Sequence, residues 1–545
     1  MFTIENGKRK LEIPQGFSLR PRLDDSDDLT ELGEANILYR LLGDEFVYNK
    51  TLGLYWYDGS RWKDGENEIR WALEELTEAQ AVDQLVNEAQ VKQEASIRRE
   101  ELNSQLSLVT KYSTDQEREN IKKQVMEIAG KTARDELSSS RRYKAFIDQM
   151  RRKAKIDAVV ALFETLVKQV NASEFDSDPL LVNLPGGTYD IRTGQTREHR
   201  PDDLITKIFL CDPSEDEEQL GIWEAFLERV QDGKPLTRIA LQSLAGCIAV
   251  GKVYEEKLII AKGEGGNGKS TFFNALMRVM SGTDGDSAQE RGAYASSIDS
   301  SLLISDPKGN NAYKRFLKLH LRGLRLAVAG ETEEHAHLDA STVKSICSTD
   351  DITAEVKHKQ GTITFTPSHT VILYTNHLPD IDSTDDGIWD RISVFPFDDR
   401  IRNAEDEIKN YTDELVRKAG GALVKWIIDG AQMFYQDNFK LYESPEMLRE
   451  KELYRERNDL LHAFIRDKCA RKRGYSVGAE EFYQAYRGYC SETGREPRSR
   501  QFVRDYLAKA GIYRGARRAE GWQYSGIKLD DSGVLNDDGA QVSTV

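Results

Sequence analysis

The sequence has little of what marks several large classes of proteins. Its 545 residues contain five cysteines, with no C-x-x-C pair and no histidine cluster beside them: Cys211, Cys247, Cys347, Cys469 and Cys490. This distribution predicts neither a disulfide framework nor a zinc site. No run of about 18 apolar residues occurs, and the opening MFTIENGKRK lacks the order of a secretory signal. We therefore expect an intracellular, cytoplasmic protein without membrane contact.

Length and charge set further limits. A chain of 545 residues is too long for one compact core and favours roughly three or four units. Hydrophobic residues make up 39% and charged residues 31%, which is typical of a soluble globular protein. The formal net charge of -16 argues against a protein that coats nucleic acid, so we expect any such contact to be local.

Proline is missing from a long stretch of the N-terminal half. None occurs between Pro21 and Pro179, and the apolar residues from Glu66 to Val170 recur at helical spacing. Within this helical region, the charge-rich residues 85–135 favour an exposed helical hairpin. The hairpin is either a solvated spacer or a partner-binding coiled coil, and the lack of sustained heptads favours the spacer.

A phosphate-binding motif is present in the middle of the chain. Residues 263–270, GEGGNGKS, fit G-x-x-x-x-G-K-[ST] and follow the apolar strand KLIIA. The glycines let backbone N–H groups surround phosphate oxygens, and the following helix presents its positive end to the same anion. We expect Lys269 to reach the β and γ phosphates and the Ser270 hydroxyl to hold Mg²⁺. The predicted nucleotide-binding residues are Gly263, Glu264, Gly265, Gly266, Asn267, Gly268, Lys269, Ser270 and Thr271.

Two later apolar strands end in polar residues that suit the same chemistry. LRLAVAGETEEH leads to Glu331, which we assign to the metal ion, and Glu333 is the nearest candidate for the base that activates water. Glu334 is an alternative base, and the alternative for both acids is the start of a solvated helix. The strand HTVILYTNHLP ends at Asn376, whose amide suits contact with the γ-phosphate or the attacking water.

Taken in order, GEGGNGKST, LAVAGETEE, VILYTNHLP and DGIWDRISVFPF resemble the motifs of superfamily 3 helicases. In particular, they resemble the helicase portion of phage and plasmid primase-helicases, which are related to poxvirus primase-helicases. The resemblance extends from about residue 40 to 530. It implies an α/β fold, in which an AAA+-like P-loop ATPase core joins an N-terminal mainly helical domain to a C-terminal winged helix. It also implies a hexameric ring that hydrolyses ATP with Mg²⁺ and moves along single-stranded DNA, typically 3′ to 5′.

The resemblance also assigns a role to Arg391 in IWDRISVFPF. This residue occupies the position of an arginine finger for the neighbouring subunit's nucleotide, and the alternative is a structural ion pair beside Asp390. The family usually has two arginines there. No acidic metal-binding pattern of a primase precedes residue 230, so we expect any priming to come from a separate primase or polymerase. The expected setting is replication of a phage, plasmid or other mobile element in the host cytoplasm.

A basic hairpin is predicted between the second and third of these strands. EVKHKQGTITF has a turn residue at Gly361 and an alternating strand after it. In the resembled family, a hairpin at this place projects into the ring channel and contacts DNA. Lys357, His358 and Lys359 would form its tip, where lysine suits a moving contact with phosphates. The alternative is a solvated loop.

These patterns divide the chain into six segments. They are a charged, loop-like N-terminal segment (1–35), a mixed helical domain (36–178), a connecting and collar region (179–250), the ATPase domain (251–444), a winged-helix-like domain of helices followed by strands (445–530) and a disordered acidic tail (531–545). Basic and aromatic residues in 445–530 favour contact with forked DNA. We therefore expect an ATP-dependent DNA helicase. The alternatives are an ATP-assembled origin-binding or scaffold protein and an RNA or packaging translocase.

Overall fold

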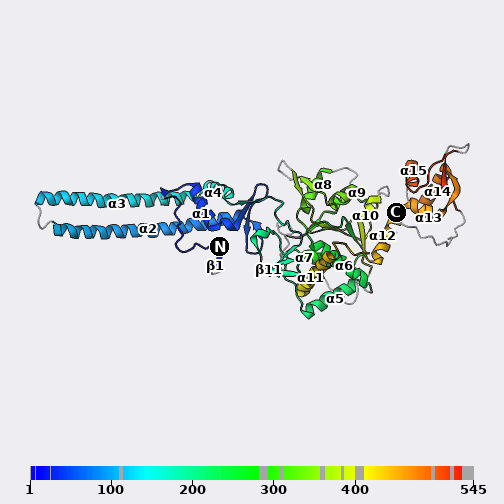
Figure 1. Cartoon of the computed structure of the whole chain (residues 1–545), viewed down its shortest axis with the longest axis horizontal. Coiled ribbons are helices and arrows are strands. Elements are labelled where there is room, and N and C mark those ends of the chain that lie inside the picture. The colour runs from blue at the N-terminus through cyan, green and yellow to red at the C-terminus, as the bar shows by residue number, and fades with distance from the viewer. Residues whose placement is uncertain are drawn as a thin grey trace. The chain divides into compact units, whose positions relative to one another are not determined.

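The structure is a computed structural model of a mixed α/β protein (Figure 1). It describes residues 2–5, 8–24, 26–109, 114–231, 233–281, 293–305, 311–334, 336–355, 362–381, 386–398, 410–492, 497–515 and 521–530. The chain divides into two compact units, Met1–Ser177 with His199–Thr206 and Asp178–Glu198 with Lys207–Val545. None of the helices in these described ranges is long and apolar enough to cross a membrane.

The first unit is built on a small sheet beside two helices. The strands β5 (Phe46–Asn49), β6 (Gly53–Tyr57), β7 (Trp62–Asp64) and β8 (Lys168–Gln169) lie in the order β7-β6-β5-β8. Helices α1 (Glu31–Leu42) and α4 (Lys153–Leu166) pack together, and Phe163 of α4 meets Phe46 edge to face with ring centroids 5.3 Å apart. The segment expected to be loop-like contains two short hairpins, β1 (Phe2–Glu5) with β2 (Lys8–Leu11) and β3 (Arg22–Leu23) with β4 (Ser26–Asp27).

Two long helices of the first unit form an antiparallel pair. Helices α2 (Glu66–Val109) and α3 (Asp115–Met150) lie side by side along most of their length (Figure 1). This pair confirms the expected helical hairpin. Polar contacts join the two helices, since Gln84 donates to the Ser140 hydroxyl at 3.0 Å. Farther along the pair, Arg98 of α2 lies 3.8 Å from Glu136 of α3, whereas Leu73 and Ile147 share a hydrophobic core near the sheet. The spacer role of residues 85–135 stays a prediction.

The second unit contains a five-stranded parallel sheet. Its strands are β12 (Leu258–Lys262), β13 (Ala295–Ile298), β14 (Leu326–Ala329), β17 (Thr370–Thr375) and β18 (Ile392–Pro396), in the order β13-β14-β17-β12-β18. All neighbouring pairs are parallel. Alternate residues of β12 enter two different cores, Ile259 on one face and Ile260 on the other. This is the apolar run on both faces that a parallel sheet between helices requires.

Helices cover both faces of this sheet (Figure 1). One face carries α5 (Glu217–Val230), α6 (Pro235–Ala249), α7 (Lys269–Val279) and α11 (Tyr411–Gln436), and the other carries α8 (Asn311–Leu317), α9 (Ala340–Ile346) and α10 (Asp386–Asp390). Helices α6 and α11 cross at glycines, because a Cβ added at Gly246 would lie 2.0 Å from the Gly430 carbonyl oxygen. Short 3₁₀ helices span Gly43–Glu45, Pro201–Asp203, Ser300–Leu302 and Lys318–Leu321.

Two smaller sheets of the second unit are antiparallel, and one of them is the base of a hairpin expected from the sequence. Strands β9 (Leu181–Leu184), β10 (Gly187–Asp190) and β11 (Gln195–Arg197) form one, in which both neighbouring pairs are antiparallel. In the other, β15 (Ile352–Glu355) pairs antiparallel with β16 (Thr362–Phe365). This pair is the base of the predicted basic hairpin, whose tip residues Lys357, His358, Lys359 and Gly361 lie outside the described residues.

The C-terminal part has a hydrophobic core of its own. The elements of the C-terminal part are α12 (Pro445–Asn458), α13 (Leu460–Lys468), β19 (Cys469–Gly478), α14 (Ala479–Glu492), α15 (Arg500–Lys509) and β20 (Gln523–Leu529). Phe464, Phe482 and Ile527 are buried in this core. The expected order of helices followed by strands is wrong for β19, which precedes α14 and pairs antiparallel with β20. The local pattern missed it because the partner strand is distant in sequence. The acidic tail, 531–545, lies outside the described residues.

Candidate functional site

Three positions predicted from the sequence follow neighbouring strands of the parallel sheet. The loop that begins at Gly263 follows β12, Glu331 comes just after β14, and Asn376 follows β17. These strands are adjacent in the order β14-β17-β12. Because the strands are parallel, their carboxyl ends share one edge, and open α/β sheets bind ligands at that edge.

The loop between β12 and α7 has a backbone that requires glycine. Gly265, Gly266 and Gly268 have φ angles of 94°, 68° and 79°, which side chains rarely allow. The loop is also pressed against the end of β18, because a Cβ at Gly263 would lie 2.2 Å from the Phe397 carbonyl oxygen. The Asn267 side-chain amide donates to that same oxygen. The loop is therefore a tight turn anchored to the sheet.

Lys269, the first residue of α7, carries the buried charge at this edge. It is 4% exposed, and its Nζ donates to the Gly263 carbonyl at 2.6 Å, Asn267 Oδ1 at 3.0 Å and Asn376 Oδ1 at 3.1 Å. Burial lowers the pKa of Lys269 to about 8, against the opposing effect of the Glu331 carboxylate. Neutral oxygens thus hold an ammonium that an anion would stabilise more strongly.

Asn376 links Lys269 to Glu331. Its Oδ1 accepts from Lys269, and its Nδ2 donates to Glu331 Oε1 at 3.0 Å. The Glu331 side chain is exposed, and its charge adds to burial in raising the pKa of the neighbouring Tyr374. Residues from three strand ends thereby form one hydrogen-bonded chain, which we call the Lys269–Asn376–Glu331 cluster. Their roles in chemistry stay predictions.

The remaining predicted residues of this edge are exposed or half-buried. Ser270 is exposed in the first turn of α7, Thr271 is half-buried beside it, and Glu264 is exposed in the loop. Glu333 is also exposed, and no hydrogen bond or ion pair within the described ranges joins its carboxylate to the Lys269–Asn376–Glu331 cluster. The choice of Glu333 over Glu334 as a base therefore stays a prediction.

The donor set of this edge fits Mg²⁺ and a polyphosphate. Ser270 and Glu331 offer accessible oxygen donors, which Mg²⁺ prefers. The tight glycine loop opens α7 at Lys269, so an anion there meets backbone N–H groups at the start of an 11-residue helix. A buried lysine whose acceptors are all uncharged is further consistent with an anionic ligand.

Arg391 lies at the opposite end of the strands, where the amino ends of β12 and β18 meet. It immediately precedes β18, and its carbonyl accepts from the Leu258 N–H at the start of β12, at 2.6 Å. The loop leaves the other end of β12, after Lys262. Four residue steps of about 3.3 Å separate the two edges by about 13 Å along β12. Arg391 is therefore not part of the Lys269–Asn376–Glu331 cluster of its own chain.

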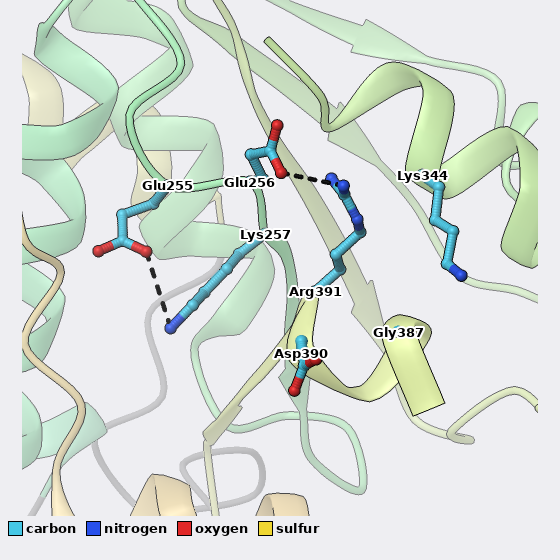
Figure 2. Close-up of a pocket in the computed structure, with 7 residues that line it drawn as sticks. All are labelled: Glu255, Glu256, Lys257, Lys344, Gly387, Asp390 and Arg391. Atoms are coloured by element: carbon cyan, nitrogen blue, oxygen red, sulfur yellow. Dashed lines mark ion pairs between the residues drawn. The ribbon is translucent and has the colours of Figure 1, made fainter. Parts of the chain in front are cut away.

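A pocket adjoins Arg391 (Figure 2). It has a volume of about 520 Å³ and is lined by Glu255, Glu256, Lys257, Lys344, Gly387, Asp390 and Arg391. Arg391 Nη2 forms an ion pair with Glu256 Oε2 at 2.9 Å, whereas Glu255 points away toward Lys257. The partner of Arg391 is thus Glu256, not the adjacent Asp390. Within the described part of the chain, Arg391 Nη1 is buried and has no hydrogen-bond acceptor.

The base of the basic hairpin is tied to α8. Glu355, the last residue of β15, forms an ion pair with Arg315 at 2.9 Å. Its carboxylate is therefore already paired near the predicted DNA-binding tip. The tip residues Lys357, His358 and Lys359 lie outside the described residues, so their DNA contact stays a prediction.

Sequence reasoning missed two groups of residues around these sites. Glu256 precedes β12 and looks like an ordinary charged residue before a strand, so no local pattern marks it as the partner of Arg391. The sequence also gave no indication that helix α12 contacts the parallel sheet. Its Glu450 pairs with Lys262 at 2.6 Å, and Glu443, just before the helix, pairs with Lys257 at 2.8 Å. In both groups the paired residues are more than a hundred positions apart in the sequence, so no local motif can indicate the pairing.

Two known families match separate parts of the chain. Residues 35–232 match the family described as "D5 N terminal like", and residues 261–391 match one described as a "Family of unknown function (DUF5906)". The second match includes the glycine loop, Glu331, Asn376 and Arg391. The first match covers the helical hairpin and the elements on either side of it.

Several proteins of large DNA viruses are similar in sequence. A protein of Acanthamoeba polyphaga mimivirus named as a "putative helicase" is 27% identical over 354 residues, which are 61% of this chain and 35% of that protein. A "putative helicase" of Frog virus 3 is 19% identical over 427 residues, or 64% and 42% of the two chains. A "putative primase" of African swine fever virus is 28% identical over 247 residues, or 42% and 24%. The chain therefore spans less than half the length of each of these relatives.

Among solved structures, one similar fold is the apo structure of the NrS-1 C-terminal region. It has 12% sequence identity and a TM-score of 0.41, and it covers 68% of this chain and 89% of that one.

Proposed function

We propose that this chain, which is similar to the helicase portion of primase-helicases, is an ATP-dependent DNA helicase. The Lys269–Asn376–Glu331 cluster carries this proposal. A lysine at a helix start beneath a glycine loop, joined to an acid and an amide from adjacent strands, has the layout that phosphoryl transfer to water needs. The strand order, with β12 between β17 and β18, supports an AAA+-like P-loop core.

Each residue of this edge has a proposed task. The loop from Gly263 to Thr271 holds the phosphates, and Lys269 exchanges its neutral acceptors for phosphate oxygens. Ser270 and Glu331 hold Mg²⁺, which neutralises charge on the transferred phosphoryl group when bound. Asn376 moves with the γ-phosphate because it contacts both Lys269 and Glu331. Glu333, or else Glu334, accepts the proton of the attacking water.

The separation of the two edges supports action between subunits. The backbone of Arg391 lies about 13 Å from the loop along β12, so its side chain is poorly placed to act on its own nucleotide. In a closed ring with head-to-tail contacts, one edge of each subunit faces a different edge of the next. Arg391 then stabilises the transition-state charge on the neighbour's nucleotide, as an arginine finger does. We take the ring to be a hexamer.

DNA contacts are assigned to two surfaces. Lys357, His358 and Lys359 of the basic hairpin contact the single strand in the ring channel, with translocation from 3′ to 5′. The C-terminal part, in which two helices, a strand, two helices and a second strand follow one another, acts as a winged helix on forked DNA. Tyr513 and Trp522 are exposed there at 67% and 41%, as stacking on bases requires. Priming is left to a separate primase or polymerase.

The deciding experiment measures ATP hydrolysis and strand displacement on forked DNA. The wild-type chain should hydrolyse ATP faster when single-stranded DNA is added and should separate the strands, whereas Lys269→Ala should do neither. Lys262→Ala is the matched control, because this lysine lies just before the loop but pairs with Glu450. ATP-dependent assembly on DNA without a change in turnover would favour an origin-binding or scaffold protein. Stimulation by RNA instead of DNA would favour an RNA translocase.

A further inference from the structure

Glu256 contacts two parts of the second unit that are far apart in sequence. One carboxylate oxygen, Oε2, pairs with Arg391 Nη2 at 2.9 Å (Figure 2). The other, Oε1, accepts from the Thr349 N–H at 3.1 Å and from the hydroxyls of Ser348 and Thr349 at 3.4 Å each. A single carboxylate thus bridges the predicted arginine finger and the turn after α9.

The turn held by Glu256 leads directly into the basic hairpin. Ser348 and Thr349 are followed by Asp351 and then by β15. Asp351 accepts from the Thr366 hydroxyl at 2.7 Å, and Thr366 directly follows β16, the partner strand. The two strands of the hairpin base are therefore tied together just beside the turn. Thr349, which Glu256 contacts, therefore lies two residues before Asp351 and the hairpin base.

Arg391 is held in an incompletely satisfied position. Its Nη2 has the Glu256 carboxylate, but its Nη1 is buried and has no acceptor within the described ranges. A buried donor without a partner disfavours the conformation that contains it. The pocket beside Arg391 offers space for the side chain to turn, and the other charged groups that line it are Glu255, Lys257, Lys344 and Asp390. The ion pair with Glu256 opposes this rotation of the Arg391 side chain.

We propose that Glu256 is a positioning residue that holds Arg391 within its own subunit and releases it when DNA displaces the base of the β15–β16 hairpin. This inference rests on the proposed function, because it assigns the regulation of the same ATPase site. While Arg391 is paired with Glu256, its guanidinium cannot reach the nucleotide of the neighbouring subunit. When the hairpin base moves, Glu256 follows the Thr349 turn, and Arg391 turns into the pocket. DNA occupancy thereby sets the rate of ATP hydrolysis.

The test compares ATP turnover of the full chain with and without an oligothymidylate. Glu256→Gln keeps an acceptor for the Thr349 N–H but removes the charge that holds Arg391. Its DNA-free turnover should rise toward the stimulated rate, so that the ratio of stimulated to DNA-free turnover falls by at least about fivefold, the lower range of coupling between linked sites. Glu255→Gln is the matched control, because Glu255 lines the same pocket but accepts from the Leu441 N–H instead, at 2.9 Å. Its ratio should equal that of the wild type.

A second variant distinguishes the proposed coupling from a purely structural role of Glu256. Glu256→Ala removes both contacts, and it should lower the ratio in the same way while speeding amide hydrogen exchange in residues 347–355. An unchanged ratio in Glu256→Gln overturns the inference while the proposed function stands. An equal loss of DNA-free and stimulated turnover, with a lower Tm, also overturns it, because Glu256 would then serve only the fold. A wild-type chain without ATP hydrolysis overturns the proposed function itself, and the coupling falls with it.

Discussion

The lowered pKa of Lys269 makes a quantitative prediction about nucleotide affinity. With a pKa of about 8, its ammonium is about nine-tenths charged at pH 7, half charged at pH 8 and about one-tenth charged at pH 9. A polyphosphate prefers the charged form, so binding at high pH must first protonate the lysine. Affinity for ADP should therefore fall about tenfold between pH 7 and pH 9, and binding at pH 8 should take up about half a proton. The phosphate groups add little, since they ionise near pH 6.

Isothermal titration calorimetry with ADP in two buffers of different ionisation enthalpy measures both quantities. Lys269→Arg keeps its charge throughout, because a guanidinium does not titrate in this range, so its affinity should not vary with pH whatever its absolute value. Lys262→Arg is the control, and it should retain the pH dependence of the wild type. A wild-type affinity that is the same at pH 7 and pH 9, with no proton uptake at pH 8, would refute the reasoning.

Two further predictions concern Glu34 and Arg391. Burial raises the pKa of Glu34 to about 7, so the folded state binds a proton that the unfolded state releases near 4.5, and stability falls as pH rises from 4.5 to 7. Glu34→Gln should remove up to about 3 kcal/mol of this loss and raise the Tm at pH 8 but not at pH 4; an equal Tm at pH 8 would contradict this. Arg391→Ala should lower ATP turnover by about 10³ or more. Mixing it with Lys269→Ala subunits should restore part of the activity, because some interfaces then pair an intact loop with an intact arginine, and no recovery after subunit exchange would count against action between subunits.

Local sequence patterns were sufficient for the parts of the site that a short segment builds by itself. The loop around Gly263 needs residues that accept positive φ, and glycine spacing reports this need directly. Glu331 and Asn376 were found because each follows an apolar strand, and parallel strands bring their carboxyl ends to one edge. The hydrogen bonds that join Asn376 to Lys269 and Glu331 follow from that edge once the strand order is known.

Patterns of this kind could not supply the partners of charged side chains. Arg391 was expected either to act as a finger or to pair with Asp390, and its partner is Glu256. The strand β19 was misplaced for a related reason, since its stability depends on pairing with β20 after two intervening helices. In both cases the deciding contact links residues that no helical or strand period connects.

The sequence by itself determined the family motifs, the glycine loop and the long helical hairpin, because backbone conformation and burial depend on residues a few positions apart. Only the tertiary structure decided that the Lys269–Asn376–Glu331 cluster and Arg391 lie at opposite edges of one sheet. It also decided that Glu256 joins Arg391 to the base of the basic hairpin. These facts depend on the order and direction of strands, which hydrophobic packing over the whole unit selects.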